Sequence, residues 1–143
     1  MDEVAENLFV GDFEDADRLG TNHSFDAVVS LIEDNVEAET IYEPLTDGEN
    51  NQKSFDSAVD AVQEVWSDDK RVLVHCAMGV SRSVTVAATA IAAEREISLR
   101  DALAQVEENR PQANPHPELV EQAYTYLGRQ PPQPFDSPQD LDS

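Results

Sequence analysis

The sequence predicts a three-layer α/β domain with a mostly parallel central sheet of about four to five strands flanked by helices. Two patterns indicate this fold class. Short apolar runs alternate with segments at helical spacing in the first half of the chain, and helical segments follow one another in the second half. The length of 143 residues suits one domain with a modest core.

The first half begins with an apolar run at 8–11, which we expect to be a strand ending in a turn. Residues 12–19 have an acidic start and a basic end, the charge order that stabilises a short helix. A buried strand is expected within 25–32, because six residues there are nearly all apolar. Another strand is expected at 40–45, with Pro44 marking its end or an irregularity.

A polar loop follows at 46–53, and Ser54 is then the expected N-cap of a helix. Its core-facing stripe would consist of the apolar side chains at helical spacing, namely Phe55, Ala58, Val59, Val62, Val65 and Trp66. Residues 71–75 read as the next strand.

The second half is predicted to be helical. Residues 83–94 are apolar nearly all round, which is typical of a helix at the centre of a domain. Ser98, with Asp101 three residues later, predicts the start of a further helix. After a proline-containing loop at 110–116, a last helix is expected from Pro117 to Gly128, with its inward side chains being Leu119, Val120, Ala123, Tyr124 and Leu127.

The final segment, 129–143, has few apolar residues and several prolines. We therefore expect a folded domain over residues 1–128 and a disordered tail after it.

The most informative stretch is His75-Cys76-Ala77-Met78-Gly79-Val80-Ser81-Arg82-Ser83, which contains the only cysteine. It lies between a predicted buried strand and a predicted helix N-terminus. Such a junction binds phosphate groups, because the helix end offers unpaired N–H groups and a positive partial charge. The same field stabilises a thiolate.

Each position in this stretch has an expected task. Gly79 permits a positive φ angle, so that the N–H groups of Ala77, Met78, Gly79, Val80 and Ser81 can surround an anion. Arg82 can grip two phosphate oxygens with its planar guanidinium. Cys76 would attack phosphorus and form a phospho-cysteine intermediate. Ser83 could donate its hydroxyl to the sulfur and make it a better leaving group, and His75 is expected to orient the loop through hydrogen bonds from its ring.

These residues resemble the Cys-x5-Arg signature of the cysteine-dependent protein tyrosine phosphatases, and the pattern His-Cys-x-x-Gly-x-Ser-Arg-Ser is similar to that of the dual-specificity branch. The resemblance extends over nearly all of residues 1–128. It implies a protein-tyrosine-phosphatase-like fold. It also implies hydrolysis of phosphotyrosine, and of phosphoserine and phosphothreonine, in phosphoproteins without metal or other cofactor.

Three alternatives stay open from the residues. A lone cysteine is often a buried structural residue, although Arg82 six positions later argues against this for Cys76. The chain could be a phospho-binding module that has lost turnover. It could also transfer sulfur, because rhodanese-type loops also join a cysteine to a helix end.

Cleavage of an ester with a poor leaving group also needs a proton donor. In the family that the chain resembles, this donor is an aspartate on a loop upstream of the cysteine, and Asp47 lies in the corresponding loop, 29 residues before Cys76 (76 − 47). The resemblance therefore implies that Asp47 is the general acid. Glu49 and Glu43 remain rivals, because acidic residues are common in this chain. Asp56 is a weaker rival because it belongs to a predicted helix.

The charge of the chain is strongly negative, with 30 acidic and 9 basic residues and a net charge of −21. Only two of the basic residues, Lys53 and Lys70, are lysines. This composition resembles that of proteins from salt-in haloarchaea, because about 1 M salt shortens the Debye length to roughly 3 Å and screens the repulsion. An acidic surface that binds a basic partner is the alternative.

Composition also excludes several functions. No basic stripe is available for nucleic acid, and no apolar run is long enough to span a membrane. The acidic N-terminus does not look like a signal peptide, and one cysteine suits a reducing compartment, so we expect a cytoplasmic protein. The three histidines, His23, His75 and His116, are far apart in sequence, so no metal site is expected. The sequence leaves the oligomeric state open.

Overall fold

The fold is described from a computed structural model, which describes residues 1–128. The predicted tail at 129–143 lies outside the described residues. The elements follow one another as β1 (Asp2–Ala5), β2 (Leu8–Gly11), α1 (Phe13–Asp17), β3 (Ala27–Ser30), β4 (Ile41–Tyr42), α2 (Gln52–Val65), β5 (Val72–His75), α3 (Arg82–Arg95), α4 (Leu99–Asn109) and α5 (Pro117–Gly128).

The strands form one sheet in the order β1-β2-β5-β3-β4. β1 and β2 are antiparallel, whereas the pairs β2–β5, β5–β3 and β3–β4 are parallel. The central strand β5 is buried along its whole length, as its continuous apolar run predicts for a parallel strand covered on both faces. The predicted α/β class and mostly parallel sheet are confirmed.

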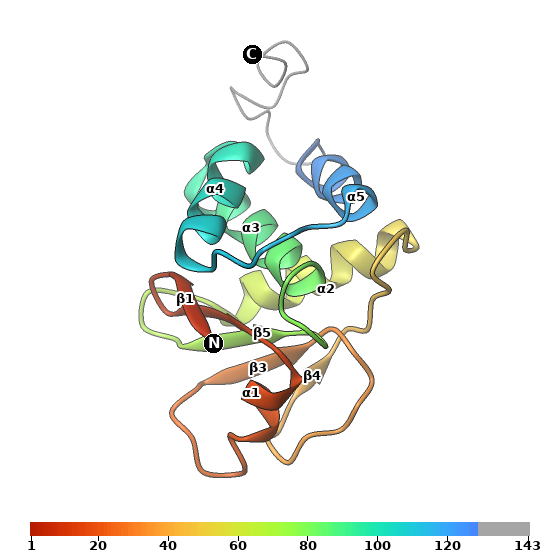
Figure 1. Cartoon of the computed structure of the whole chain (residues 1–143). Coiled ribbons are helices and arrows are strands. Elements are labelled where there is room, and N and C mark those ends of the chain that lie inside the picture. The colour runs from red at the N-terminus through yellow and green to blue at the C-terminus, as the bar shows by residue number, and fades with distance from the viewer. Residues whose placement is uncertain (129–143) are drawn as a thin grey trace.

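The sheet separates two layers of unequal thickness. Figure 1 shows α2, α3, α4 and α5 together on one face and the short α1 on the other. Successive side chains of a strand point to opposite faces. Val72 and Val74 accordingly join the large core under the four helices, while Leu73 packs with Ala16 and Val28 in a small cluster beside α1.

Helix α3 lies at the centre of the large layer and packs against α2, α4 and α5. Every residue from Ser83 to Ala92 is buried, which agrees with the apolar character predicted all round this helix. Its N-terminus is therefore held firmly at the end of β5, and this position sets the site described below.

Two edge strands differ from the expectation. β1 was not predicted, since Asp2–Ala5 has only two apolar residues, and it forms because β2 offers an antiparallel partner. β4 has only two residues of the predicted 40–45. Glu43 and Leu45 still donate their N–H groups to Ser30 and Leu31 at 2.8 and 2.9 Å, but the strand is interrupted at Pro44, which has no N–H.

Two details of the helices also require correction. The N-cap of α2 is Asn51, whose side chain accepts a hydrogen bond from the Lys53 N–H at 2.9 Å, and the predicted cap Ser54 lies inside the first turn. In α5 the fully buried tyrosine is Tyr126, whereas Tyr124 is half-buried. The helix is rotated slightly from the expected face, so the polar side chain of Gln122 is also buried.

Candidate active site

The stretch 75–83 begins where the three central parallel strands end together. His75 pairs with Gly11 of β2 on one side and Ser30 of β3 on the other. Ligands of parallel α/β sheets bind beyond the carboxyl ends of the strands. Residues 76–81, which we call the phosphate loop, occupy that position and lead directly into α3.

Cys76 is 2% exposed at the base of the phosphate loop. The Gly79 N–H donates to its Sγ at 3.2 Å, and the Ser83 Oγ lies 3.2 Å from the same sulfur. Two donors within the loop can therefore stabilise negative charge on this sulfur, in addition to the N-terminal end of α3.

The carbonyl groups of the phosphate loop are hydrogen-bonded to neighbouring segments of the chain. Three of them accept hydrogen bonds from outside the loop: Ala77 from the Phe13 N–H at 3.2 Å, Gly79 from Arg110 Nε at 2.6 Å, and Val80 from the Asn114 N–H at 2.6 Å. Within residues 1–128, the N–H groups of Ala77, Met78 and Val80 have no acceptor. Such a set of free donors beside a helix N-terminus is suited to an anion with several oxygens.

Arg110 is a site residue whose role sequence reasoning missed. It is 4% exposed, and besides its bond to Gly79 it forms an ion pair with Asp2 Oδ2 at 2.6 Å. Gly79 has φ = +69°, and a Cβ at this position would lie 2.6 Å from Arg110 Nη2 and 2.7 Å from the Gly11 carbonyl oxygen. The loop thus needs a glycine here for its backbone angle and for space.

Arg82, the first residue of α3, lies between the phosphate loop and the loop that follows β4. Its Nη1 donates to the Leu45 carbonyl oxygen at 3.1 Å. Within residues 1–128, its Nε and Nη2 have no protein partner. The side chain borders a cavity of about 400 Å³ beside Pro44 and Thr46, so the guanidinium can still reach a ligand from this position.

Asp47 contacts the phosphate loop directly. Its Oδ1 accepts a hydrogen bond from Ser81 Oγ at 2.6 Å, and Ser81 Oγ in turn accepts one from the His116 N–H at 2.9 Å. Because Ser81 already accepts from His116, its single hydroxyl proton is directed toward Asp47. A residue expected only as part of the phosphate-binding backbone therefore also holds the carboxylate.

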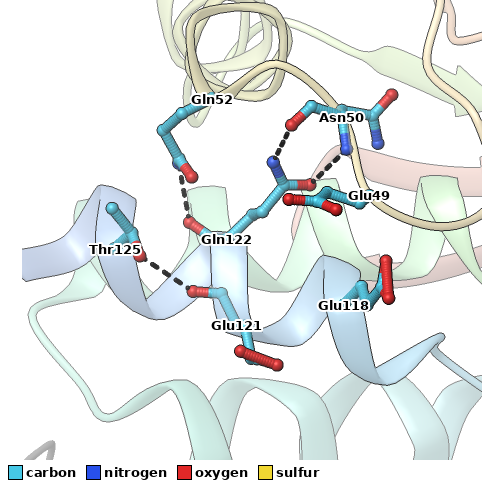
Figure 2. A pocket seen from close by; sticks show the side chains of 7 residues that line it. All are labelled: Glu49, Asn50, Gln52, Glu118, Glu121, Gln122 and Thr125. Atoms are coloured by element: carbon cyan, nitrogen blue, oxygen red, sulfur yellow. Dashed lines mark hydrogen bonds between the residues drawn. The ribbon is translucent and has the colours of Figure 1, made fainter.

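The three rival carboxylates are engaged elsewhere. Glu43 Oε1 accepts a hydrogen bond from Ser57 at 2.9 Å, and Asp56 Oδ1 accepts one from Gln52 at 2.9 Å within α2. Glu49 belongs to a separate pocket of about 450 Å³ (Figure 2). This pocket lies between α5 and residues 46–51, which carry Asp47 and which we call the acid-bearing loop. Of the four candidates, only Asp47 contacts the phosphate loop.

His75 does not act as expected. Its ring is fully buried, and neither ring nitrogen has a hydrogen-bond partner within residues 1–128. Burial lowers the pKa of this imidazole, although the backbone of Cys76 and the charges of Asp12 and Asp15 oppose the shift. The phosphate loop is instead oriented by the segment 110–116, so the expected ring hydrogen bonds of His75 were wrong.

The comparisons with known proteins point to one family. Residues 8–128 match the family model described as dual specificity phosphatase, catalytic domain. The chain is 35% identical to the dual specificity protein phosphatase Mpk3 of Drosophila melanogaster over 85 residues, which are 58% of this chain and 21% of Mpk3. It is 24% identical to the tyrosine-protein phosphatase yvh1 of Schizosaccharomyces pombe over 136 residues, or 89% of this chain and 41% of yvh1. The chain thus spans about a fifth of Mpk3 and less than half of yvh1.

Solved structures share the fold. The crystal structure of human DUSP28 superimposes with a TM-score of 0.73 at 22% identity, covering 90% of this chain and 96% of DUSP28. The Yvh1 phosphatase domain from Chaetomium thermophilum gives a TM-score of 0.70 at 26% identity, covering 87% and 92%. Within residues 1–128, no helix is both long and apolar enough to cross a bilayer.

Proposed function

The chain belongs to the dual specificity phosphatase catalytic domain family, and on this premise we propose that it hydrolyses phosphotyrosine, phosphoserine and phosphothreonine in phosphoproteins without a metal ion. The observation that supports the proposal best is the environment of Cys76. Its sulfur accepts the Gly79 N–H and lies beside the Ser83 hydroxyl, in a loop where three backbone N–H groups have no acceptor within residues 1–128.

The first step would transfer the phosphoryl group to the enzyme. The Cys76 thiolate attacks phosphorus, an S–P bond forms, and the P–O bond to the substrate breaks with its electron pair on the leaving oxygen. The free N–H groups of the phosphate loop and the Arg82 guanidinium stabilise the charge on the phosphoryl oxygens. Asp47 gives its proton to the leaving oxygen.

The second step would return the enzyme to its starting state. The Asp47 carboxylate takes a proton from water as the water oxygen attacks phosphorus. The S–P bond then breaks, inorganic phosphate forms, and the electron pair returns to sulfur. The Ser83 Oγ, 3.2 Å from Sγ, can donate a hydrogen bond to this leaving thiolate.

Turnover of phosphotyrosine and phosphoserine peptides in concentrated KCl tests this proposal. The wild-type chain should show a burst of product with p-nitrophenyl phosphate, and Cys76→Ser should abolish it. Activity that survives Cys76→Ser, or that disappears when a chelator is added, would contradict the mechanism. Binding of a phosphopeptide without any turnover would favour the phospho-binding module, and turnover of thiosulfate instead of phosphate esters would favour sulfur transfer.

A second variant tests the proton donor. Asp47→Asn should lower kcat by about 10²-fold or more with a phosphoserine peptide, whose leaving group is poor, and by much less with p-nitrophenyl phosphate. Glu49→Gln is the matched control, because Glu49 lies in the same loop without touching the phosphate loop. A large loss in Glu49→Gln with normal activity in Asp47→Asn would move the role to Glu49.

A further inference from the structure

Helix α5 carries a buried polar side chain that the proposed mechanism does not use. Gln122 is 8% exposed and lies among Leu119, Ala123 and Tyr126 on the inward face of the helix. An amide in such a place costs free energy unless its donors and acceptor find partners.

The partners of Gln122 belong to the loop that carries Asp47. Its Nε2 donates to the Asn50 carbonyl oxygen at 2.5 Å, and its Oε1 accepts the Asn50 N–H at 3.2 Å. The amide thus binds both backbone groups of one residue, as Figure 2 shows. Gln52 Nε2 adds a bond to the Gln122 carbonyl oxygen at 3.0 Å, which ties the start of α2 to the same turn of α5.

The side chain of Asn50 in turn forms hydrogen bonds with the backbone of its own loop. Its Oδ1 accepts the Thr46 N–H at 2.7 Å, and its Nδ2 donates to the carbonyl oxygens of Thr46 and Gly48, each at 3.1 Å. Asp47 lies between these two residues. Its position therefore depends on Asn50, and the position of Asn50 depends on Gln122.

Little else holds this loop. Thr46, Asp47 and Glu49 are exposed, so apolar packing does not fix the backbone between Leu45 and Asn50. The bond from Ser81 to Asp47 comes from the phosphate loop, and the bond from Arg82 to Leu45 comes from the first residue of α3. The bonds of Gln122 come from α5 instead and complete the support.

We propose that Gln122 is a positioning residue that places Asp47 for proton transfer by clamping Asn50 to α5. This inference rests on the proposed function and on the role of Asp47 as the acid. A displacement of about 1 Å can cost up to about 10²-fold in rate, so a residue distant from the reacting atoms can control the step. Neither Cys76 nor the phosphate loop touches Gln122.

Replacement of the amide by a thioether of similar length, Gln122→Met, tests the proposal. We expect kcat with a phosphoserine peptide to fall by about tenfold or more. The change with p-nitrophenyl phosphate should be less than about threefold, because that leaving group hardly needs a proton. KM for both substrates should stay nearly constant, because the phosphate loop is unchanged.

Tyr126→Phe is the matched control. Tyr126 is buried on the same helix, and its hydroxyl lies 2.6 Å from Asp60 Oδ1 and 2.6 Å from Gln63 Oε1, away from the acid-bearing loop. Tyr126→Phe should lower the free energy of unfolding, and any change in kcat should be the same with the phosphoserine peptide and with p-nitrophenyl phosphate. If Gln122→Met does not fold, Asn50→Ala removes the same support from a surface loop and should give the same difference.

A double-mutant cycle with Asp47→Asn decides the outcome. If Gln122 acts through Asp47, Gln122→Met should cause no further loss of kcat in the Asp47→Asn background. Two results would overturn the proposal. One is that Gln122→Met lowers kcat equally with good and poor leaving groups. The other is that it lowers kcat in the Asp47→Asn background as much as in the wild-type background. Failure of the proposed function itself would look different, since the wild-type chain would then show no turnover that depends on Cys76.

Discussion

The substitution Gly79→Ala is expected to damage the phosphate loop, because two separate effects coincide at this position. A φ of +69° costs a residue with a Cβ about 1–2 kcal/mol. The new Cβ would also lie 2.6 Å from Arg110 Nη2, 2.7 Å from the Gly11 carbonyl oxygen and 2.8 Å from the Gly11 carbonyl carbon. Two of these atoms are backbone, so the loop itself has to move.

The cost of that movement follows from the contacts it breaks. The bond from Arg110 to the Gly79 carbonyl involves a charged donor and contributes about 1.5–3 kcal/mol. Together with the backbone strain, Gly79→Ala should lower the free energy of unfolding by about 2.5–5 kcal/mol. The Gly79 N–H would also leave Cys76 Sγ. A displaced loop would also misplace the N–H groups that would face the phosphoryl oxygens. The loss of one donor to the charge that develops in a transition state costs about 10²–10³-fold in kcat in other enzymes, and we expect a similar loss here.

Gly20→Ala separates the two effects. Gly20 has φ = +61°, but the nearest atom to a Cβ there is Glu37 Oε1 at 3.6 Å, and Gly20 is not part of the site. This control should lose about 1–2 kcal/mol and keep its activity. Urea unfolding in concentrated KCl measures both stabilities, and p-nitrophenyl phosphate turnover measures both activities. The reasoning is wrong if Gly79→Ala loses no more stability than Gly20→Ala, or if it retains full activity.

Three further predictions concern the supports of the site and the charge of the chain. Arg110→Met should lower the free energy of unfolding by about 2 kcal/mol or more and reduce turnover, because the Gly79 carbonyl loses a charged donor. Asp2→Asn should cost less, because the asparagine Oδ1 can still accept a hydrogen bond from Arg110 Nη1. Equal costs would argue against the Gly79 bond as the main contribution of Arg110. Burial lowers the pKa of His75 below its usual 6.5, so the unfolded chain binds the proton at a higher pH than the folded chain does, and stability falls as the pH drops through and below 6.5. In urea unfolding, His75→Phe should lose less stability than the wild-type chain over the same pH interval. Parallel profiles of the two proteins would contradict this. The melting temperature should rise steeply between low and multimolar KCl, because salt screens a net charge of −21; equal stability at both concentrations would exclude salt adaptation.

The elements that the sequence predicted well depend on interactions between near neighbours. The side chain of Ser98 accepts the Asp101 N–H at 3.0 Å, as the spacing of three indicates for a helix start. The Cys76 sulfur, the Gly79 N–H and the Ser83 hydroxyl lie within eight consecutive residues, so their contact follows once a strand precedes and a helix follows. Both flanking elements could be read from apolar runs.

Predictions failed where two local signals competed or where a distant partner decided. Asn51 and Ser54 are both good N-cap residues. The loop that Asn50 closes ends directly before Asn51, so the helix begins after Asn51 and not after Ser54. β1 has little strand character of its own and exists because β2 pairs with it. The rotation of α5 that buries Gln122 and Tyr126 also depends on its packing partners, which periodicity alone does not reveal.

The sequence by itself determined which residues are candidates for a phosphate site, because the thiol, the arginine, the glycine and the helix end that such a site needs are contiguous. The resemblance already favoured Asp47 over its three rivals, but only the tertiary structure revealed its contact with Ser81, which joins residues 34 positions apart. The same holds for the support of Gly79 by Arg110 across 31 positions and of Asn50 by Gln122 across 72. Side chains that act alone can be recognised in a short stretch, whereas those that place another group depend on which distant segments the sheet and α3 bring together.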